Sequence, residues 1–199
     1  MFYGLKLFEA MEKYSLAIRP SDEIVFKVKQ VKSLLREESR TFFRSQNSEA
    51  HISIFEYEVG ERQGRIIANT FSRLVPSLRP FVINYKGFNH FQNGDYYTFY
   101  IQLNALASNI IREYASIIKK ECRFSLKNRC SIPHMSVGRH LNQNQLNIAY
   151  GLFKSFEQTD FCNSFVLRIF NPLRKQYDII ANMPLLGTDN SKGQLNLFS

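Results

Sequence analysis

A short phrase, in which serine follows histidine by two positions, occurs twice in this chain and constrains its fold more than any other feature. His51-Ile52-Ser53 stands in one apolar segment, and His134-Met135-Ser136 stands in another, 83 residues later. Both segments are predicted to be β-strands, in which side chains two residues apart project from the same face. Each strand therefore presents one imidazole and one hydroxyl side by side on one surface.

The periodicity of apolar residues predicts the same order of elements around both motifs. A strand and a helix lead into each motif strand, and a helix and two strands follow it. The predicted strands are 14–19, 51–57, 81–91, 96–103, 132–137, 165–170 and 176–183, and the predicted helices are 23–36, 62–74, 104–120 and 143–156. This internal repeat predicts an α+β fold with two pseudo-symmetric lobes of antiparallel sheet, helices outside, and the two His-x-Ser strands lining a central cleft.

The length of 199 residues suits one core, and we expect a single domain over residues 1–187 followed by a tail, 188–199. Residues 187–193 have the composition of a flexible linker. The segment after them, QLNLF at 194–198, is similar to the short motif by which bacterial replication and repair proteins dock on the sliding clamp. The alternative is a terminal segment that folds back onto its own core.

Composition narrows the class of protein and of partner. The net charge of +9 favours polyanionic partners, nucleic acid first, although a basic surface with no such role is an equal alternative. Three cysteines without CxxC spacing indicate free thiols in a reducing compartment. No segment has the length of a membrane span or the pattern of a signal peptide, so the expected location is the cytoplasm, with no membrane partner.

Cleavage of a phosphodiester needs a base for the attacking nucleophile and an acid for the departing oxygen. Histidine suits both tasks because its pKa lies near neutrality. His51 and His134 are therefore candidate catalytic residues, and Ser53 and Ser136 are candidate donors to the non-bridging phosphate oxygens. No carboxylate cluster stands beside these histidines, so we expect no metal and no other cofactor. The alternative is that each histidine is a satisfied core or edge side chain.

The two motifs resemble those of the 2H phosphoesterase superfamily, which includes the 2′-5′ RNA ligases and the RNA 2′,3′-cyclic phosphodiesterases. In many relatives the second motif continues to an arginine, and Arg139 stands in that place, where it is a candidate phosphate-binding residue. Both hydroxyls here are serine, where the ligase-like branch usually has threonine. The resemblance implies a metal-independent phosphodiesterase that hydrolyses 2′,3′-cyclic phosphates or other 2′-linked phosphodiesters on RNA or nucleotides.

Two further interpretations of the same motifs remain open. The first is a non-catalytic domain that binds RNA or a nucleotide, although a binding protein has no need of both histidines. The second is a phosphodiesterase of small cyclic or 2′,5′-linked oligonucleotides. The sequence does not assign the acid and the base between His51 and His134.

Overall fold

The computed structural model describes residues 10–122, 128–129 and 131–188, and Cys130 and the predicted QLNLF segment lie outside the described residues. Four α-helices and nine strands are described. In chain order they are β1 (Met11–Ile18), α1 (Asp22–Ser39), β2 (Ile52–Gly60), α2 (Glu61–Leu74), β3 (Phe81–Asn93), β4 (Tyr96–Leu103), α3 (Ala105–Glu121), β5 (Asn128–Arg129), β6 (His134–Leu141), α4 (Gln143–Leu152), β7 (Glu157–Cys162), β8 (Ser164–Asn171) and β9 (Gln176–Pro184). A short 3₁₀ helix, Val75–Ser77, follows α2.

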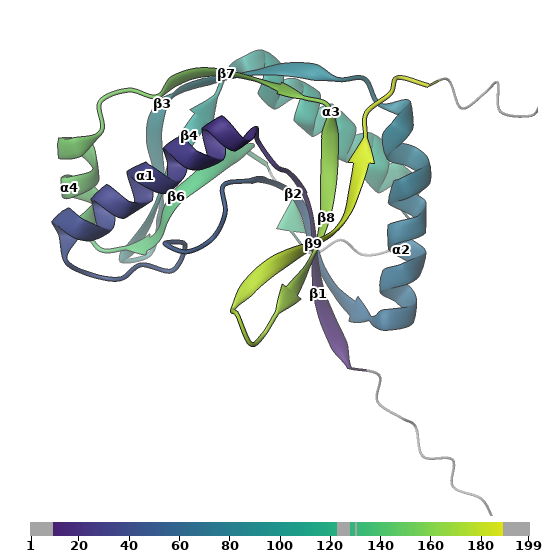
Figure 1. Ribbon diagram of the computed structural model, residues 1–199, viewed down its shortest axis with the longest axis horizontal. Coiled ribbons are helices and arrows are strands. Elements are labelled where there is room, and N and C mark those ends of the chain that lie inside the picture. The colour runs from purple at the N-terminus through teal and green to yellow at the C-terminus, as the bar shows by residue number, and fades with distance from the viewer. Residues whose placement is uncertain (1–9, 123–127, 130, 189–199) are drawn as a thin grey trace, which may run out of the picture.

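The described strands form one curved antiparallel sheet in the order β7-β3-β4-β6-β2-β1-β8-β9, with β5 paired to β2 (Figure 1). The two motif strands, β6 and β2, therefore lie side by side at the centre, with three further strands outside each of them. The strand that leads into each motif through a helix, β4 or β1, is the immediate neighbour of that motif strand. The predicted two-lobed α+β fold is confirmed, and the two lobes share a single continuous sheet.

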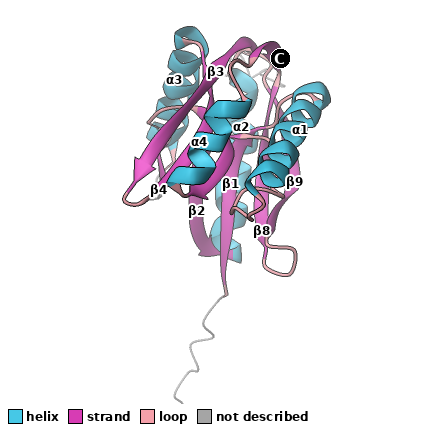
Figure 2. Ribbon diagram, turned by 90° about the vertical axis from the view of Figure 1, so that its left-hand side faces the viewer, coloured by secondary structure: helices cyan, strands magenta, loops and turns pink. Residues whose placement is uncertain are grey.

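The helices pack in two groups against the sheet. α1 and α4 lie side by side and contact β6, while α2 contacts β1 and β2, and α3 contacts β2 and β3 (Figure 2). Apolar side chains of the strands fill the space beneath the helices, among them Leu16, Ile52, Phe55, Ile101 and Met135, all of which are buried. Since neighbouring residues of a strand face opposite sides, the polar side chains that alternate with them lie on the other face of the sheet.

Local capping sets where two of the helices begin. The side chain of Asn104 accepts a hydrogen bond from the backbone N–H of Ala107 at the start of α3. Asn142 and Gln145 form a reciprocal capping box at the start of α4. Each cap satisfies N–H groups that the first helical turn leaves without a partner.

Two sequence predictions in the C-terminal half were wrong. α4 ends at Leu152 instead of residue 156, because the aromatic rings of Phe153 and Phe156 turn away to pack on Phe88, at centroid distances of 5.6 and 5.9 Å. The strand β7 was not predicted. It is an edge strand that pairs only with β3 among the described strands, and its alternating polar residues resemble a loop in sequence.

The predicted free thiols are confirmed for Cys122 and Cys162, which are both buried and unpaired. Within the described residues, no helix is both long enough and apolar enough to cross a membrane.

Gly64 of α2 tests the packing of that helix on the sheet, and Gly151 of α4 serves as its control. A Cβ added at Gly64 would lie 2.5 Å from the hydroxyl oxygen of Tyr14, whose buried ring stacks on Tyr57, whereas a Cβ at Gly151 would meet nothing within 4 Å. We expect Gly64→Ala to lower the free energy of unfolding by about 1–3 kcal/mol, because the ring must shift. Gly151→Ala should raise it by up to about 1 kcal/mol through helix propensity. Urea unfolding of both variants measures this, and equal stability of Gly64→Ala and the wild type would contradict it.

Candidate active site

The two motifs meet at the seam between the central strands. β2 and β6 pair antiparallel at Ile52 and Met135, the middle residues of the two motifs, and both of these side chains are buried beneath the sheet. Continuing this register by one residue places His51 opposite Ser136, and Ser53 opposite His134. The four polar side chains therefore lie together on the face of the sheet opposite the core, with each histidine across from the other strand's serine.

A cavity of about 750 Å³ opens on this face, and all five residues singled out from the sequence line it: His51, Ser53, His134, Ser136 and Arg139. The remaining lining residues come mainly from the segment between α1 and β2, from β2 itself, and from β8, β9 and the turn that joins them. They are Lys13, Arg44, Ser45, Ser48, Glu49, Ile54, Glu56, Phe91, Thr98, Arg168, Phe170, Lys175, Gln176 and Tyr177.

A β-bulge directs Arg139 into the cavity. The consecutive residues 99–100 of β4 pair with Gly138 and Ser136, so Val137 is an extra residue in β6. In an unbroken strand, Arg139 would face away from Ser136, because the two residues are three positions apart. The extra residue reverses this alternation, so Arg139 shares the cavity with His134 and Ser136.

The first motif strand carries a bulge at the equivalent position. The consecutive residues 16–17 of β1 pair with Phe55 and Ser53, so Ile54 is extra, and Glu56 also lines the cavity. The two strands therefore follow the patterns His-x-Ser-x-x-Glu and His-x-Ser-x-x-Arg. The backbone is symmetric at the seam, but an acidic side chain and a basic side chain occupy equivalent places.

Both histidines are held in the same tautomer. The Nδ1 atom of His51 lies 2.7 Å from the carbonyl oxygen of Glu49, and the Nδ1 atom of His134 lies 2.8 Å from the carbonyl oxygen of Ile132. A carbonyl oxygen only accepts hydrogen bonds, so each Nδ1 carries a proton and donates it. In the neutral ring, Nε2 then carries the lone pair that can accept a proton.

The surroundings favour the neutral form of both imidazoles. Burial lowers the pKa of His51 well below its usual value, and the nearby charges of Arg168, Lys32 and Arg139 lower it further. Burial and the charge of Arg139 also lower the pKa of His134. An anion bound between the rings would favour their protonated forms, so the site is prepared for a negatively charged ligand.

Aromatic rings surround the second histidine. The ring centroid of His134 lies 5.0 Å from that of Phe91 and 5.0 Å from that of Tyr100, and those two rings stack on each other at 4.3 Å. Phe91 lines the cavity and is only partly buried, so one side of the cavity near His134 presents an aromatic surface.

A buried lysine fastens the segment between α1 and β2 to the bulge of β6. The ammonium of Lys32 donates to the carbonyl oxygens of Ser45 and Ser48, at 3.0 and 2.7 Å. The Ser45 hydroxyl in turn donates to the carbonyl of Val137 at 2.9 Å and accepts from the backbone N–H of Arg139 at 2.9 Å. Burial lowers the pKa of Lys32 to about 8. This chain of contacts fixes the backbone from which Arg139 projects.

Sequence reasoning missed several residues of the cavity. Glu56 could have been predicted, because it follows His51 by the same number of positions as Arg139 follows His134. Nothing in the sequence marks Arg168 or Phe91, because they enter the cavity from strands whose neighbours only the sheet order reveals.

Two further observations bear on what the molecule can bind. In the described part of the chain, no group of three or more His, Cys, Asp or Glu side chains is placed to hold a metal ion.

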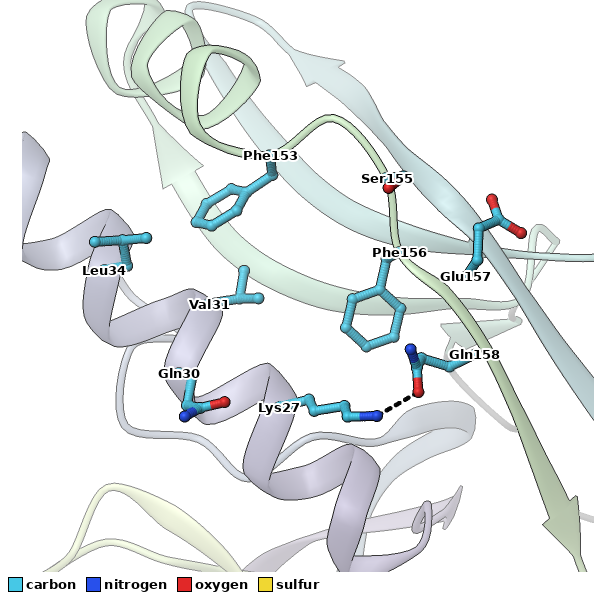
Figure 3. Close-up of a pocket in the computed structure, with 9 residues that line it drawn as sticks. All are labelled: Lys27, Gln30, Val31, Leu34, Phe153, Ser155, Phe156, Glu157 and Gln158. Atoms are coloured by element: carbon cyan, nitrogen blue, oxygen red, sulfur yellow. Dashed lines mark hydrogen bonds between the residues drawn. The ribbon is translucent and has the colours of Figure 1, made fainter.

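A separate pocket of about 430 Å³ lies between α1 and the connection from α4 to β7 (Figure 3). In this pocket Val31, Leu34, Phe153 and Phe156 face one another, and Lys27 donates a hydrogen bond to Gln158. It contains no motif residue.

Comparison with known proteins identifies the fold. No protein-family model matches the chain, and no curated protein matches it by sequence. Among solved structures, Escherichia coli LigT in complex with NADP+ is similar at a TM-score of 0.61, with 14% identity over 89% of this chain and 99% of LigT. LigT is also known in complex with 3′-AMP, with phosphate and with ATP.

Two other structures show the same likeness. TT0787 of Thermus thermophilus matches at a TM-score of 0.61, with 13% identity over 89% of this chain and 100% of its own. Usb1 of Kluyveromyces marxianus matches at 0.52, with 12% identity over 89% of this chain and 99% of its own. The chain therefore has the fold of LigT, TT0787 and Usb1.

Proposed function

We propose that this protein is a phosphodiesterase of the 2H type, with His51 and His134 as its acid–base pair. The proposed substrates are 2′,3′-cyclic phosphates or other 2′-linked phosphodiesters on RNA or nucleotides, cleaved without a metal ion. The observation that carries this proposal is the matched state of the two rings. Both donate Nδ1–H to a backbone carbonyl, both line one cavity, and the Nε2 of each neutral ring carries the lone pair that proton transfer needs.

The proposed reaction places the phosphorus between the two strands. One Nε2 accepts a proton from water as the water oxygen bonds to phosphorus. The bond from phosphorus to a ribose oxygen breaks, and the protonated Nε2 of the other histidine gives its proton to that oxygen. The product is a phosphomonoester with a free ribose hydroxyl. Ser53, Ser136 and Arg139 would donate to the non-bridging oxygens, where negative charge develops in the transition state.

Two other observations support a nucleotide or RNA substrate. LigT, which has this fold, binds 3′-AMP, NADP+ and phosphate. The described residues of the cavity include five lysines and arginines against two glutamates. A surplus of positive charge lowers the free energy of a bound phosphate and steers polyanions toward the cavity.

A turnover assay in the presence of EDTA tests the proposal. Nucleoside 2′,3′-cyclic monophosphates and an RNA that ends in a 2′,3′-cyclic phosphate are offered to the wild type, and phosphorus NMR identifies the product. We expect hydrolysis to a phosphomonoester at a rate that EDTA leaves unchanged. Loss of activity with EDTA would contradict the metal-independent mechanism. Binding without turnover of any 2′-linked phosphodiester would favour a non-catalytic nucleotide-binding domain.

The pH dependence of kcat/KM follows from the two lowered pKa values. This parameter reports the free enzyme, in which one histidine must be neutral and the other protonated. Because the pKa values of His51 and His134 both lie below the usual 6.5, the bell-shaped profile should peak on the acid side of pH 6.5. Activity then falls as pH rises through neutrality, since the acid loses its proton. Initial rates across the acidic and neutral range measure the profile, and a maximum on the alkaline side of neutrality would contradict it.

A further inference from the structure

One arginine in the cavity is built into the sheet instead of reaching in from a surface loop. Arg168 of β8 pairs with Ser15 of β1, which pairs in turn with Glu56 of β2, so the three side chains form a row on the cavity face. Arg168 is only 6% exposed. Its Nη2 donates to the Ser15 hydroxyl at 2.7 Å, and its guanidinium lies 5.2 Å from the ring centroid of Tyr177.

Not every N–H group of this guanidinium has a hydrogen-bond partner among the described residues. Among the described residues, the Nε atom of Arg168 is buried and has no hydrogen-bond partner. Glu56 and Glu49 favour its charged form, yet burial outweighs them and lowers the pKa of Arg168 to about 10. A buried charge is costly unless an anion and further hydrogen bonds compensate it. A bound anion in the cavity would supply both.

The charges of the cavity are distributed unevenly about the seam. On the β1–β8–β9 side the lining includes Lys13, Arg168 and Lys175, whereas on the β3–β4 side it includes Phe91 and Thr98. Arg139 stands on β6, close enough to lower the pKa of both histidines. Of the two histidines, only His51 has its pKa lowered by the charge of Arg168. Arg139 is therefore placed for a phosphate between the histidines, and Arg168 for an anion beyond His51.

We propose that the β1–β8–β9 wall of the cavity, anchored by Arg168, binds a second phosphate of the substrate. This inference rests on the proposed function, which places the reacting phosphate at the ribose 2′ and 3′ positions. In an RNA chain the next phosphate of that nucleoside is on its 5′ oxygen. The preferred ligand is then a nucleoside with phosphates on both sides, its 5′-phosphate on Arg168 and its base toward Phe91.

A binding experiment that needs no turnover tests this subsite. Isothermal titration calorimetry compares adenosine 3′,5′-bisphosphate with adenosine 3′-monophosphate on the wild type, Arg168→Met and Arg139→Met. We expect the bisphosphate to bind the wild type at least about tenfold more tightly. This preference should disappear in Arg168→Met. Arg139→Met should weaken both ligands and keep the preference, because both ligands share the phosphate that it contacts.

Two controls keep the result interpretable. Lys154→Met removes an exposed positive charge that follows α4 and does not line the cavity, and we expect it to retain the wild-type preference. Arg168→Lys, in which the charge remains but the planar fork is lost, should show an intermediate preference if Arg168→Met fails to fold.

Each outcome has a definite meaning for the proposal. If the wild type binds both nucleotides equally, or if Arg168→Met keeps the preference, the second-phosphate site is wrong and the proposed function stands. If no nucleotide binds the wild type at millimolar concentration, the second-phosphate site is overturned, and the turnover assay decides the proposed function separately.

Discussion

Replacing His51 or His134 with alanine is expected to lower kcat by about 10²–10⁴-fold, the range that a positioned acid or base contributes. Each imidazole lines the cavity, and its Nε2 carries the lone pair because its Nδ1–H is donated to a backbone carbonyl. Alanine removes the proton-transfer group and cannot substitute for it. Because base and acid act in one displacement, we expect the double variant to lose little more than the worse single variant. Single-turnover assays on a nucleoside 2′,3′-cyclic phosphate measure all three.

The chain provides a control for the loss of a histidine as such. His90 contacts the Tyr150 hydroxyl at 2.8 Å and does not line the cavity. His90→Asn should therefore retain activity close to that of the wild type. Thermal unfolding of every variant separates lost chemistry from lost structure. Near-wild-type activity in either His51→Ala or His134→Ala, with the protein folded, would exclude the acid–base pair.

The sequence predicted those elements well whose own apolar periodicity agrees with their place in the repeat. Strands β1 to β4 and helices α1 to α3 lie where the apolar period placed them, and the two-lobed α+β fold predicted from the repeat is confirmed. The strand β7 was not predicted because an edge strand is hydrogen-bonded along one side only, and most of the side chains of β7 are exposed or half-buried. Its sequence therefore lacks the apolar pattern of a buried strand. The end of α4 was misplaced because Phe153 and Phe156 pack on Phe88 instead of extending the helix.

The residues of the candidate site likewise divide into those that the sequence could identify and those that only the structure reveals. His51 and His134 could be found because each lies in a strong strand pattern and shares a face with a serine two positions on. Arg168 could not, since its place in the cavity depends on β8 pairing with β1 across 153 residues of sequence. The orientation of Arg139 was also beyond the sequence. Its predicted role fits the cavity only because the bulge at Val137 reverses the alternation of β6.

Arg139→Met is expected to lower kcat by about 10²-fold, the loss typical for one preorganised donor to a developing oxyanion. The guanidinium lines the cavity on the same face as Ser136 and acts electrostatically on both histidines, as the proposed contact with the reacting phosphate requires. Arg139→Lys should recover part of the loss, since it restores the charge without the two-pronged geometry. Removing this charge also raises the pKa of both histidines, so the kcat/KM profile should shift toward higher pH in Arg139→Met.

The adjacent residue supplies the control for this prediction. His140 is exposed, stacks on Tyr96 and has a positive φ of 62°, which asparagine tolerates better than most residues. His140→Asn should therefore preserve the backbone of β6 and keep both the wild-type rate and the wild-type pH profile. A loss of rate in Arg139→Met without the shift in pH would mean that the arginine only supports the fold of the bulge. Rate and profile both unchanged would show that Arg139 makes no contact with the reacting phosphate.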